Sequence, residues 1–313
     1  MSEIEIMRYR PRRKLTQLLR RYDLLQFVCG TASWVCAAAE VERPTVLWSA
    51  TTLWADRAAR VQRSSAIRKA ISAVMVPAAE SYERRGLREA DAVFALSNYT
   101  RDSIKSIAPD VPTVVAPCGI DTALYSPSNS PSRSYILCVA RLSDRRKNVR
   151  LLLKAYASLA AATHPCPDLY LVGDPPSESA RSLISTMGIE GKVHLLGEKH
   201  GEELYDLYRN ALCFVLSSDE EGLGIVLLEA MASGAPVVST ACGGPETAVV
   251  QGETGLLTPV GDADALCDAM KELVSNPSLC YSMGKAGRLR AEQQFSLEAA
   301  SEVFLEQYDR LLS

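Results

Sequence analysis

The sequence predicts an α/β protein built from two domains, each with a parallel β-sheet. Short apolar runs alternate with amphipathic stretches along most of the 313 residues, and this alternation is typical of strands joined by crossover helices. The length suits two ordinary domains. Residues 125–131 are rich in Pro and Ser and indicate a linker. We therefore predict a first domain over residues 1–127 and a second over residues 128–313.

The composition is that of a soluble globular protein, with 47% hydrophobic and 23% charged residues. The net charge of −3 argues against a general nucleic-acid binder. Nine scattered cysteines and three histidines lack metal-ligand spacing and favour a reducing, cytoplasmic compartment. No apolar run approaches the ~18 residues of a membrane span. The N-terminus is charged from residue 3 and lacks the apolar core of a signal peptide.

Residues 1–21 form a basic segment, with seven Lys and Arg residues against two Glu, a net of +5. Within it, Leu15, Leu18 and Leu19 fall on one side of a helix predicted from about Pro11 to Arg21. A basic amphipathic helix can lie on anionic lipid, giving a peripheral contact with the inner face of a membrane. The alternative is a surface helix whose leucines pack on the domain. The sequence leaves both interpretations open.

The first half of the chain predicts short strands separated by helices. Strands are expected at residues 23–29, 45–48, 89–97 and 111–116, and helices at residues 31–42, 66–85 and 97–107. Pro77 interrupts the second of these helices. Trp54 and Arg57, which precede it, are candidates to face a crevice.

The second half is more regular. Strands are expected at residues 135–140, 169–172, 193–196, 211–216 and 235–239. Helices are expected at residues 149–161, 177–187, 202–210, 225–233, 262–275, 278–293 and 297–312, with a further helix opening at Glu246. This succession indicates a parallel sheet.

Two carboxylates stand out between Glu221 and Glu246. Glu221 lies in a Gly-containing loop after a buried strand, and Glu229 lies in the helix that follows. Such a helix points its N-terminus into the ligand crevice of a parallel sheet, where a carboxylate can accept hydrogen bonds from sugar hydroxyls. The alternative is a pair of solvated glutamates. Glu229, however, has mostly apolar sequence neighbours, among which a charge needs a partner.

A second candidate is the basic loop after the strand at residues 135–140. Arg141 and Lys147 lie six positions apart on this loop. Two cations at the carboxyl end of a strand can hold a diphosphate and stabilise the charge that grows as it leaves. The alternative is a solvated basic loop, because Arg145 and Arg146 lie between them.

The stretch Glu221–Glu246 resembles the donor-site signature of retaining GT-B glycosyltransferases, specifically family 4, the glycosyl transferases group 1. It carries Glu-(seven residues)-Glu, with Gly-Leu-Gly after the first Glu, then Glu-Ala-Met-Ala-Ser-Gly-Ala-Pro-Val-Val and Gly-Gly-Pro-Glu. Leu223 replaces an aromatic residue that is frequent in the family. The resemblance is continuous from Tyr135 to about Gln294. It implies two Rossmann-like domains facing across a cleft, with the C-terminal helices returning towards the N-terminal domain.

The resemblance also implies the role of each matching residue. Glu229 would hold the ribose hydroxyls of a nucleotide-sugar, and Glu221 would touch the donor sugar at the catalytic centre. Arg141 and Lys147 would hold the diphosphate and take the charge role of a metal, so no metal or other cofactor is expected. Gly222, Leu223 and Gly224 form the loop between the glutamates, and their backbone N–H groups would lie near the diphosphate. The acceptor would be a sugar, a lipid-linked molecule or a small molecule.

The N-terminal half matches more weakly, at Ala90–Asn98 and at Val115–Asp121, where Cys118 replaces the usual Asn. The Gly-rich segment that opens the family pattern is not found before Asp23, and residues 1–163 contain no His. We therefore expect a shortened N-terminal domain, from either a naturally shortened member or a fragment of a longer reading frame.

The expected function is transfer of a hexose-type sugar from a nucleotide-diphosphate donor with retention of anomeric configuration. Two alternatives are kept. The first is a catalytically inactive relative that binds nucleotide sugar or a partner. The second is a nucleotide-sugar epimerase, which shares the two-domain fold.

Overall fold

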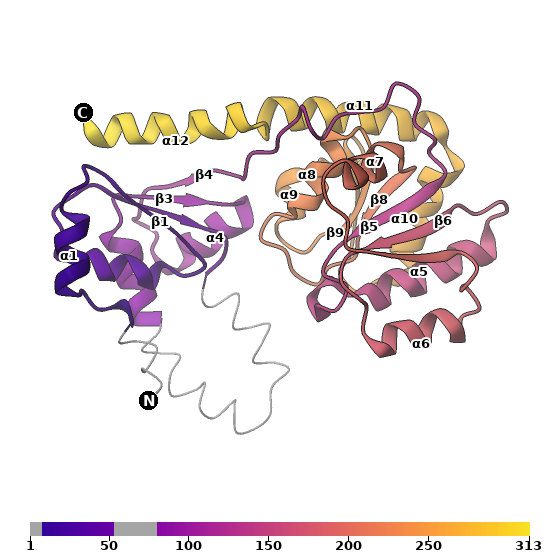
Figure 1. Cartoon of the computed structure of the whole chain (residues 1–313), viewed down its shortest axis with the longest axis horizontal. Coiled ribbons are helices and arrows are strands. Elements are labelled where there is room, and N and C mark those ends of the chain that lie inside the picture. The colour runs from indigo at the N-terminus through magenta and orange to yellow at the C-terminus, as the bar shows by residue number, and fades with distance from the viewer. Residues whose placement is uncertain (1–7, 53–79) are drawn as a thin grey trace. The chain divides into compact units, whose positions relative to one another are not determined.

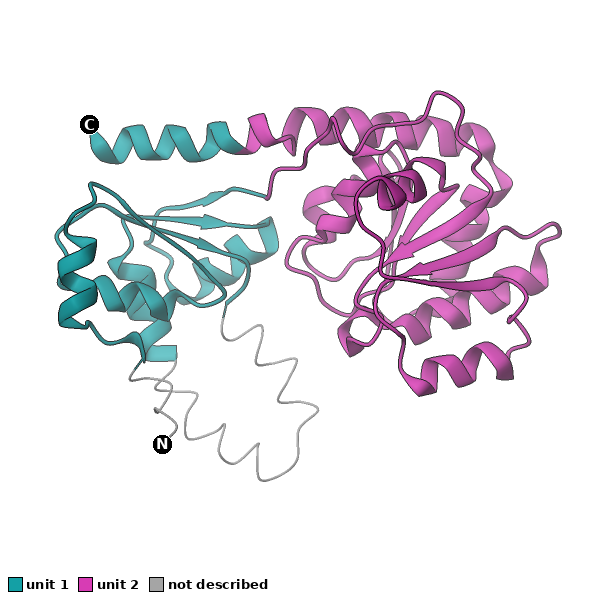
Figure 2. Cartoon of the chain, in the orientation of Figure 1, with its two compact units in different colours: residues 1–117, 301–313 teal, residues 118–300 magenta. Residues whose placement is uncertain are grey.

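The computed structural model of the chain describes residues 8–52 and 80–313, which form two compact units (Figure 1). Unit 1 consists of residues 1–117 and 301–313, and unit 2 of residues 118–300 (Figure 2). The chain leaves unit 1 after Pro117, ahead of the segment interpreted above as a linker. Trp54, Arg57 and most of the helix predicted at residues 66–85 lie outside the described residues. The predicted α/β class with two Rossmann-like parallel sheets is confirmed.

The described residues of unit 1 form a sheet of four parallel strands in the order of the chain. They are β1 (Leu25–Cys29), β2 (Thr45–Ser49), β3 (Ala92–Ala95) and β4 (Thr113–Val115). Because crossovers between parallel strands are almost always right-handed, strands added in a single direction place their connecting helices on one face. The strand order of unit 1 therefore leaves its other face to be covered by a different part of the chain.

The crossover face of unit 1 carries η2 (Ala32–Ala38), a helix at residues 80–89 and α4 (Asn98–Ile107). Its apolar core joins Val35, Leu47, Val93 and Ile104, all nearly inaccessible to solvent. The helix predicted at residues 31–42 is present over Ala32–Ala38 and is shorter than expected. This segment forms a short 3₁₀ helix, a common form for a brief connector between strands.

The opposite face of unit 1 is covered by the second half of α12 (Leu297–Leu312). Phe304 lies with its ring 4.6 Å from that of Phe94 on β3 and 5.1 Å from that of Trp48 on β2. Tyr308 adds a hydrogen bond of 2.6 Å from its hydroxyl to the side chain of Gln26 on β1. A helix from the C-terminus thus completes the core of unit 1.

The predicted basic helix is α1 (Arg13–Leu19), shorter at both ends than expected. Leu19 packs against the small cluster formed by Leu25, Ala38 and Val41, whereas Leu18 is 47% exposed. The side chains of the basic residues around the helix are exposed. No helix in the described part of the chain is long and apolar enough to cross a membrane.

The sheet of unit 2 has six parallel strands in the order β10-β9-β8-β5-β6-β7. Their bounds are β5 (Tyr135–Val139), β6 (Asp168–Val172), β7 (Val193–Gly197), β8 (Cys213–Leu216), β9 (Val237–Thr240) and β10 (Gly255–Thr258). β10 was not predicted, because its four residues begin with Gly and are too few to show a period. The strand order reverses between β5 and β8, the switch point of the sheet.

Right-handed crossovers from this switch point place helices on both faces of the sheet. The helices are α5 (Val149–Ala162), α6 (Glu178–Thr186), α7 (Glu202–Asn210), α8 (Ile225–Ala232), α9 (Pro245–Ala248), α10 (Ala263–Ser275) and α11 (Pro277–Gln294). The start of α5 is fixed by Asn148, in the left-handed conformation with φ of 42°, whose side chain accepts from the N–H of Leu151. The main core of unit 2 lies between α5, α10 and the sheet, around Leu152, Tyr156 and Met270.

Candidate functional site

The candidate site lies at the switch point of unit 2. β5 and β8 are neighbours in the sheet and run parallel, so the loops that follow them leave from the same edge. The loop after β5 carries Arg141 and Lys147, and the loop after β8 carries Glu221. Ligands of open α/β sheets bind at the carboxyl ends of the strands where the strand order reverses. The topology thus brings the two predicted loops together.

Lys147 and Glu221 form an ion pair across the switch point. The Lys147 Nζ lies 2.5 Å from the Glu221 Oε1, and the two side chains are only 15% and 11% exposed. The hydroxyl of Ser218 donates to the same carboxylate oxygen at 2.5 Å. Because few water molecules reach this pair, each charge depends on the other, and removing either would leave a poorly solvated charge.

Further hydrogen bonds tie the two loops to each other. Asn148 donates from Nδ2 to the Asp219 carboxylate at 2.7 Å, and the N–H of Asp219 donates to the carbonyl of Arg146 at 2.7 Å. The Ser217 hydroxyl donates to the carbonyl of Lys147 at 3.0 Å. The position of Lys147 relative to Glu221 is therefore fixed by the backbone as well as by the ion pair.

The arginines of the first loop differ in their surroundings. Arg141 has a side chain that is 70% exposed and lies 3.2 Å from the Asp144 carboxylate. Arg146 lies closer to the same carboxylate, at 2.8 Å, and its hydrogen bond holds the pKa of Asp144 below its usual value. Arg146 is thus bound within the loop, whereas Arg141 is accessible to a ligand.

The loop after β8 is held against the Gly-Gly turn after β9. Glu221 forms an isolated bridge with Gly243, and its carbonyl accepts from the N–H of Gly244 at 2.9 Å. A Cβ at Gly244 would lie 2.4 Å from the backbone nitrogen of Leu223, a distance that side chains do not tolerate. Leu223 itself is 1% exposed. The Gly residue is therefore required for the close contact that sets the Glu221 backbone.

A cavity of about 380 Å³ opens beside these loops, within unit 2. Strand ends contribute Gly173 and Asp174, and the first turn of α8 contributes Val226. The cavity is lined by Val139, Ala140, Arg141, Lys147, Val172, Gly173, Asp174, Glu198, Lys199, His200, Leu204, Val226 and Glu229. Because Val226 lies in the first turn of α8, the positive end of that helix's dipole lies at this end of the cavity and favours an anion.

Glu229, on α8, accepts one hydrogen bond at each carboxylate oxygen. The Tyr125 hydroxyl donates to Oε1 at 3.0 Å, and the Tyr208 hydroxyl donates to Oε2 at 2.6 Å. The sequence indicated that this charge needs a partner but identified neither tyrosine. Tyr125 falls in the segment interpreted as a linker, and Tyr208 lies in an amphipathic helix with no motif of its own.

The cavity brings together three of the predicted site residues, Arg141, Lys147 and Glu229. Glu221, Gly222, Leu223 and Gly224 do not line it, although Glu221 contacts the lining residue Lys147 through its ion pair. His200 is exposed and lines the cavity. Within residues 8–52 and 80–313, no group of His, Cys, Asp or Glu side chains is arranged to hold a metal ion.

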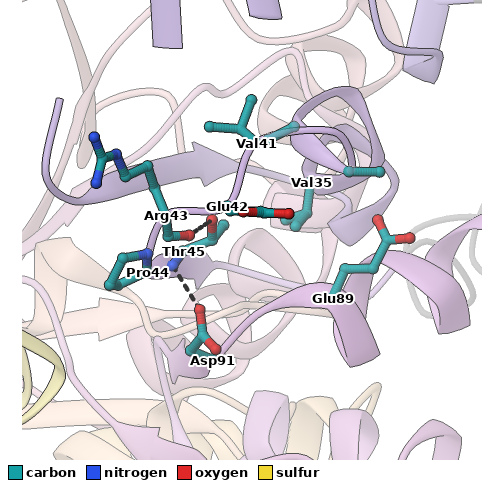
Figure 3. A pocket seen from close by; sticks show the side chains of 10 residues that line it. Val35, Val41, Glu42, Arg43, Pro44, Thr45, Glu89 and Asp91 are labelled. Atoms are coloured by element: carbon teal, nitrogen blue, oxygen red, sulfur yellow. Dashed lines mark hydrogen bonds between the residues drawn. The ribbon is translucent and has the colours of Figure 1, made fainter. Parts of the chain in front are cut away.

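Unit 1 contains a larger cavity, of about 450 Å³, between η2 and the start of β2 (Figure 3). Asp91 lies at its edge and accepts from the N–H of Thr45 at 2.7 Å. Thr45 opens β2, and Asp91 immediately precedes β3, so this cavity lies at the amino ends of the strands. Because ligands of parallel sheets bind at the opposite edge, we place the candidate site in unit 2.

Two family models match the chain. The model described as "Glycosyl transferases group 1" matches residues 126–290. The model described as "Glycosyltransferase Family 4" matches residues 3–124. The first match covers more than half of the chain and includes the whole candidate site except Tyr125.

Similar curated proteins include a mannosyltransferase and another glycosyltransferase. A GDP-mannose-dependent alpha-(1-6)-phosphatidylinositol monomannoside mannosyltransferase of Mycolicibacterium smegmatis is 30% identical in an alignment of 233 residues that covers 68% of this chain and 61% of the relative. A D-inositol 3-phosphate glycosyltransferase of an Arthrobacter species is 31% identical over 62% of this chain and 49% of its own length. The chain thus spans about three fifths or less of the length of these relatives.

Solved structures share the fold over most of the chain. Sucrose-phosphate synthase from Thermosynechococcus elongatus has a TM-score of 0.78 at 25% identity, over 95% of this chain and 77% of its own. Anabaena Alr3699/HepE in complex with UDP and glucose has a TM-score of 0.75 at 21% identity, over 95% of this chain and 81% of its own.

Proposed function

Because this chain belongs to the glycosyl transferases group 1 family, we propose that it transfers a hexose from a nucleoside-diphosphate donor to an acceptor hydroxyl, with retention of anomeric configuration. One observation carries this proposal. Two cations and a carboxylate of the predicted donor site, Arg141, Lys147 and Glu229, line one cavity at the switch point of unit 2. Complexes of a structural neighbour with UDP and glucose support a donor of this class.

In this proposal, the diphosphate lies between the first loop and the start of α8. Lys147 and Arg141 bind its oxygens as charge-assisted donors, and the N–H groups that open α8 add a favourable dipole. Glu229 accepts from the ribose hydroxyls. Glu221 contacts the donor sugar, and its ion pair with Lys147 connects the sugar position to the diphosphate position.

The departing diphosphate gains negative charge as the bond to the sugar breaks. Cations already fixed at that position stabilise the transition state more than the ground state, which accelerates the reaction. We propose that Arg141 and Lys147 supply this charge, so that turnover needs no metal ion. Activity that persists in excess EDTA would support this part, and loss of activity restored by Mg²⁺ would contradict it.

The experiment that tests the main proposal has two stages. Calorimetric titration of the full chain with UDP and with GDP should show saturable binding of at least one of them. Incubation with UDP-glucose or GDP-mannose, with and without acceptors, should then release the matching nucleoside diphosphate. NMR of the sugar product should show the donor's anomeric configuration.

Glu221→Gln should lower turnover by about a hundredfold or more, the lower end of the range for loss of a positioned polar group. Glu272→Gln, at an exposed position of α10, is the matched control and should leave the turnover rate unchanged. Nucleotide binding without turnover would favour the inactive relative over an enzyme. Interconversion of the donor sugar without an acceptor would favour the epimerase.

The surface around α1 suits a lipid-linked acceptor presented at a membrane. Arg10, Arg13, Lys14 and Arg21 are exposed there, with no acidic residue between Arg8 and Tyr22. Tyr22 is 56% exposed and, with Leu18, adds apolar contact. We propose that this surface lies on anionic lipid. A relative that acts on a phosphatidylinositol mannoside supports an acceptor of this kind.

Sedimentation with phosphatidylglycerol vesicles tests the membrane proposal. The chain should sediment with these vesicles at low salt and be released as the salt concentration rises, because the attraction between exposed charges is screened. Arg13→Glu together with Lys14→Glu should abolish binding. Equal sedimentation with neutral phosphatidylcholine vesicles would contradict an electrostatic contact.

A further inference from the structure

Glu229 is held by two tyrosines from distant parts of unit 2. Tyr125 follows the point at which the chain enters this unit, and Tyr208 lies on α7. Each donates to a different carboxylate oxygen, at 3.0 Å and 2.6 Å. Burial, followed by the nearby Glu229 charge, raises the pKa of both hydroxyls. Both therefore remain protonated donors over the pH range in which the protein would work.

These two hydrogen bonds leave the carboxylate half occupied. An ionised carboxylate offers about four lone-pair positions, and the tyrosines use two of them, one on each oxygen. Among the described residues, no other side chain donates to Glu229, and this residue lines the cavity. One lone pair on each oxygen thus remains for a ligand. Two adjacent hydroxyl donors, as in a vicinal diol, match that arrangement.

Both tyrosines are themselves well fixed. The Tyr208 side chain is fully buried, and its ring lies 5.7 Å from that of Phe214 on β8. The Tyr125 ring packs edge-on against the ring of Tyr205 at 4.8 Å. Arg288 on α11 donates to the carbonyl of Tyr125 at 2.7 Å and to that of Thr122 at 2.9 Å. Neither hydroxyl can move without disturbing these contacts.

We propose that Tyr125 and Tyr208 are positioning residues that orient Glu229 towards the 2′- and 3′-hydroxyls of the donor's ribose, and that together they set the preference for ribose over deoxyribose. The inference rests on the proposed donor site and adds to it the source of its sugar discrimination. A carboxylate held from two sides cannot rotate to suit a single hydroxyl. A nucleotide without the 2′-hydroxyl therefore leaves one acceptor unpaired, which costs affinity.

The test compares UDP with 2′-deoxy-UDP, and GDP with 2′-deoxy-GDP, by calorimetric titration of the full chain. The ratio of the two dissociation constants is measured for the wild type, Tyr125→Phe, Tyr208→Phe and Glu229→Gln. Both Phe variants keep the aromatic ring and remove only the hydroxyl. Tyr205→Phe is the matched control, because Tyr205 contacts the ring of Tyr125 but makes no hydrogen bond to Glu229.

The wild type should bind the ribonucleotide more tightly, and Glu229→Gln should reduce that preference most. Each of Tyr125→Phe and Tyr208→Phe should lower the preference by about threefold or more, the range for one lost hydrogen bond, mainly by weakening the ribonucleotide. Tyr205→Phe should leave the ratio unchanged. Circular dichroism of each variant checks that Tyr208→Phe has kept its fold.

Two results would overturn the positioning role while leaving the donor site intact. One is that both Phe variants keep the wild-type preference for the ribonucleotide although Glu229→Gln has lost it. The other is that the Phe variants bind the ribonucleotide and the deoxyribonucleotide more weakly by the same factor, which indicates that the tyrosines act through packing alone. If the wild type binds none of the four nucleotides, the donor site itself is refuted, and the inference with it.

Discussion

Unit 1 and unit 2 both consist of parallel strands joined by right-handed crossovers, but their strand orders differ. In unit 1, the strands β1 to β4 follow one another across the sheet in a single direction. In unit 2, the order β10-β9-β8-β5-β6-β7 reverses between β5 and β8. The reversal makes the loops after these two strands diverge to opposite faces, which opens a crevice between them. The described residues of unit 1 contain no such reversal.

The same difference decides how each sheet is covered. Unit 2 receives helices on both faces from its own crossovers, because its strands are added in two directions. Unit 1 receives crossover helices on one face, so its other face depends on Val303, Phe304 and Tyr308 of α12. Strand order therefore explains both the location of the candidate site in unit 2 and the need for a C-terminal helix in unit 1.

The largest expected effect is on the cover that α12 gives to unit 1. Phe304→Ala should destabilise unit 1 by about 3 kcal/mol, the lower range for truncation of a core Phe, because this partly buried ring contacts Phe94 and Trp48. The chain has three Trp residues, all within residues 1–117. The midpoint of urea unfolding followed by Trp fluorescence therefore reports on unit 1.

Leu305→Ala is the matched control, because Leu305 is 56% exposed on the same helix. This substitution should shift the midpoint of urea unfolding only slightly. Nucleotide affinity should be unchanged in both variants, since the proposed donor site lies in unit 2. Equal effects of the two substitutions would show that unit 1 does not depend on α12 for its second face.

A second prediction concerns the cations at the switch point. Lys147→Ala should weaken nucleoside-diphosphate binding by about 1.5–3 kcal/mol, or roughly tenfold to a hundredfold. The substitution removes the proposed contact with the diphosphate and leaves the Glu221 charge without its cation at a site that is only 11% exposed. Arg141→Ala should have a smaller effect, because its side chain is 70% exposed. Titration calorimetry measures both.

Arg145→Ala controls for the general positive charge of the loop, because Arg145 is exposed and does not line the cavity. The affinity of the Arg145→Ala variant for the nucleotide should remain close to that of the wild type. If all three substitutions weaken binding equally, the loop acts through its net charge, and the switch point confers no specific diphosphate site.

The smallest expected effect is a pH dependence in the loop after β5. The hydrogen bond from Arg146 holds the pKa of Asp144 below its usual value of 3.8. The carboxylate therefore stabilises the folded state fully above about pH 3.8, and this contribution is lost as the pH falls through the lower, folded-state pKa. Asp144→Asn should reduce stability at neutral pH by less than about 1 kcal/mol and flatten the acid side of the profile.

Thermal unfolding followed by far-ultraviolet circular dichroism measures this profile, with Asp268→Asn at an exposed position of α10 as the control. If Asp144→Asn has the same pH profile as the wild type, the ion pairs of Asp144 do not stabilise the loop. The Lys147–Glu221 pair is then the main charged contact that stabilises the switch point.

Much of the fold could be predicted from sequence because its elements have strong local signals. The strands β1, β2, β5 and β6 and the helices α5, α7 and α12 were expected within a few residues of their observed bounds. The errors occur where local signals are weak. β10 has too few residues to show a period, and η2 is a 3₁₀ helix shorter than the helix expected at residues 31–42.

By itself, the sequence determined the α/β class and the family, and it identified Arg141, Lys147, Glu221 and Glu229 as candidates, because these depend on periodicity and on residues close together in the chain. Tertiary structure alone decided which side chains meet. Lys147 and Glu221 are 74 positions apart, and Tyr125 and Glu229 are 104 positions apart. Such contacts depend on strand order and on where a loop returns, and no local pattern records either.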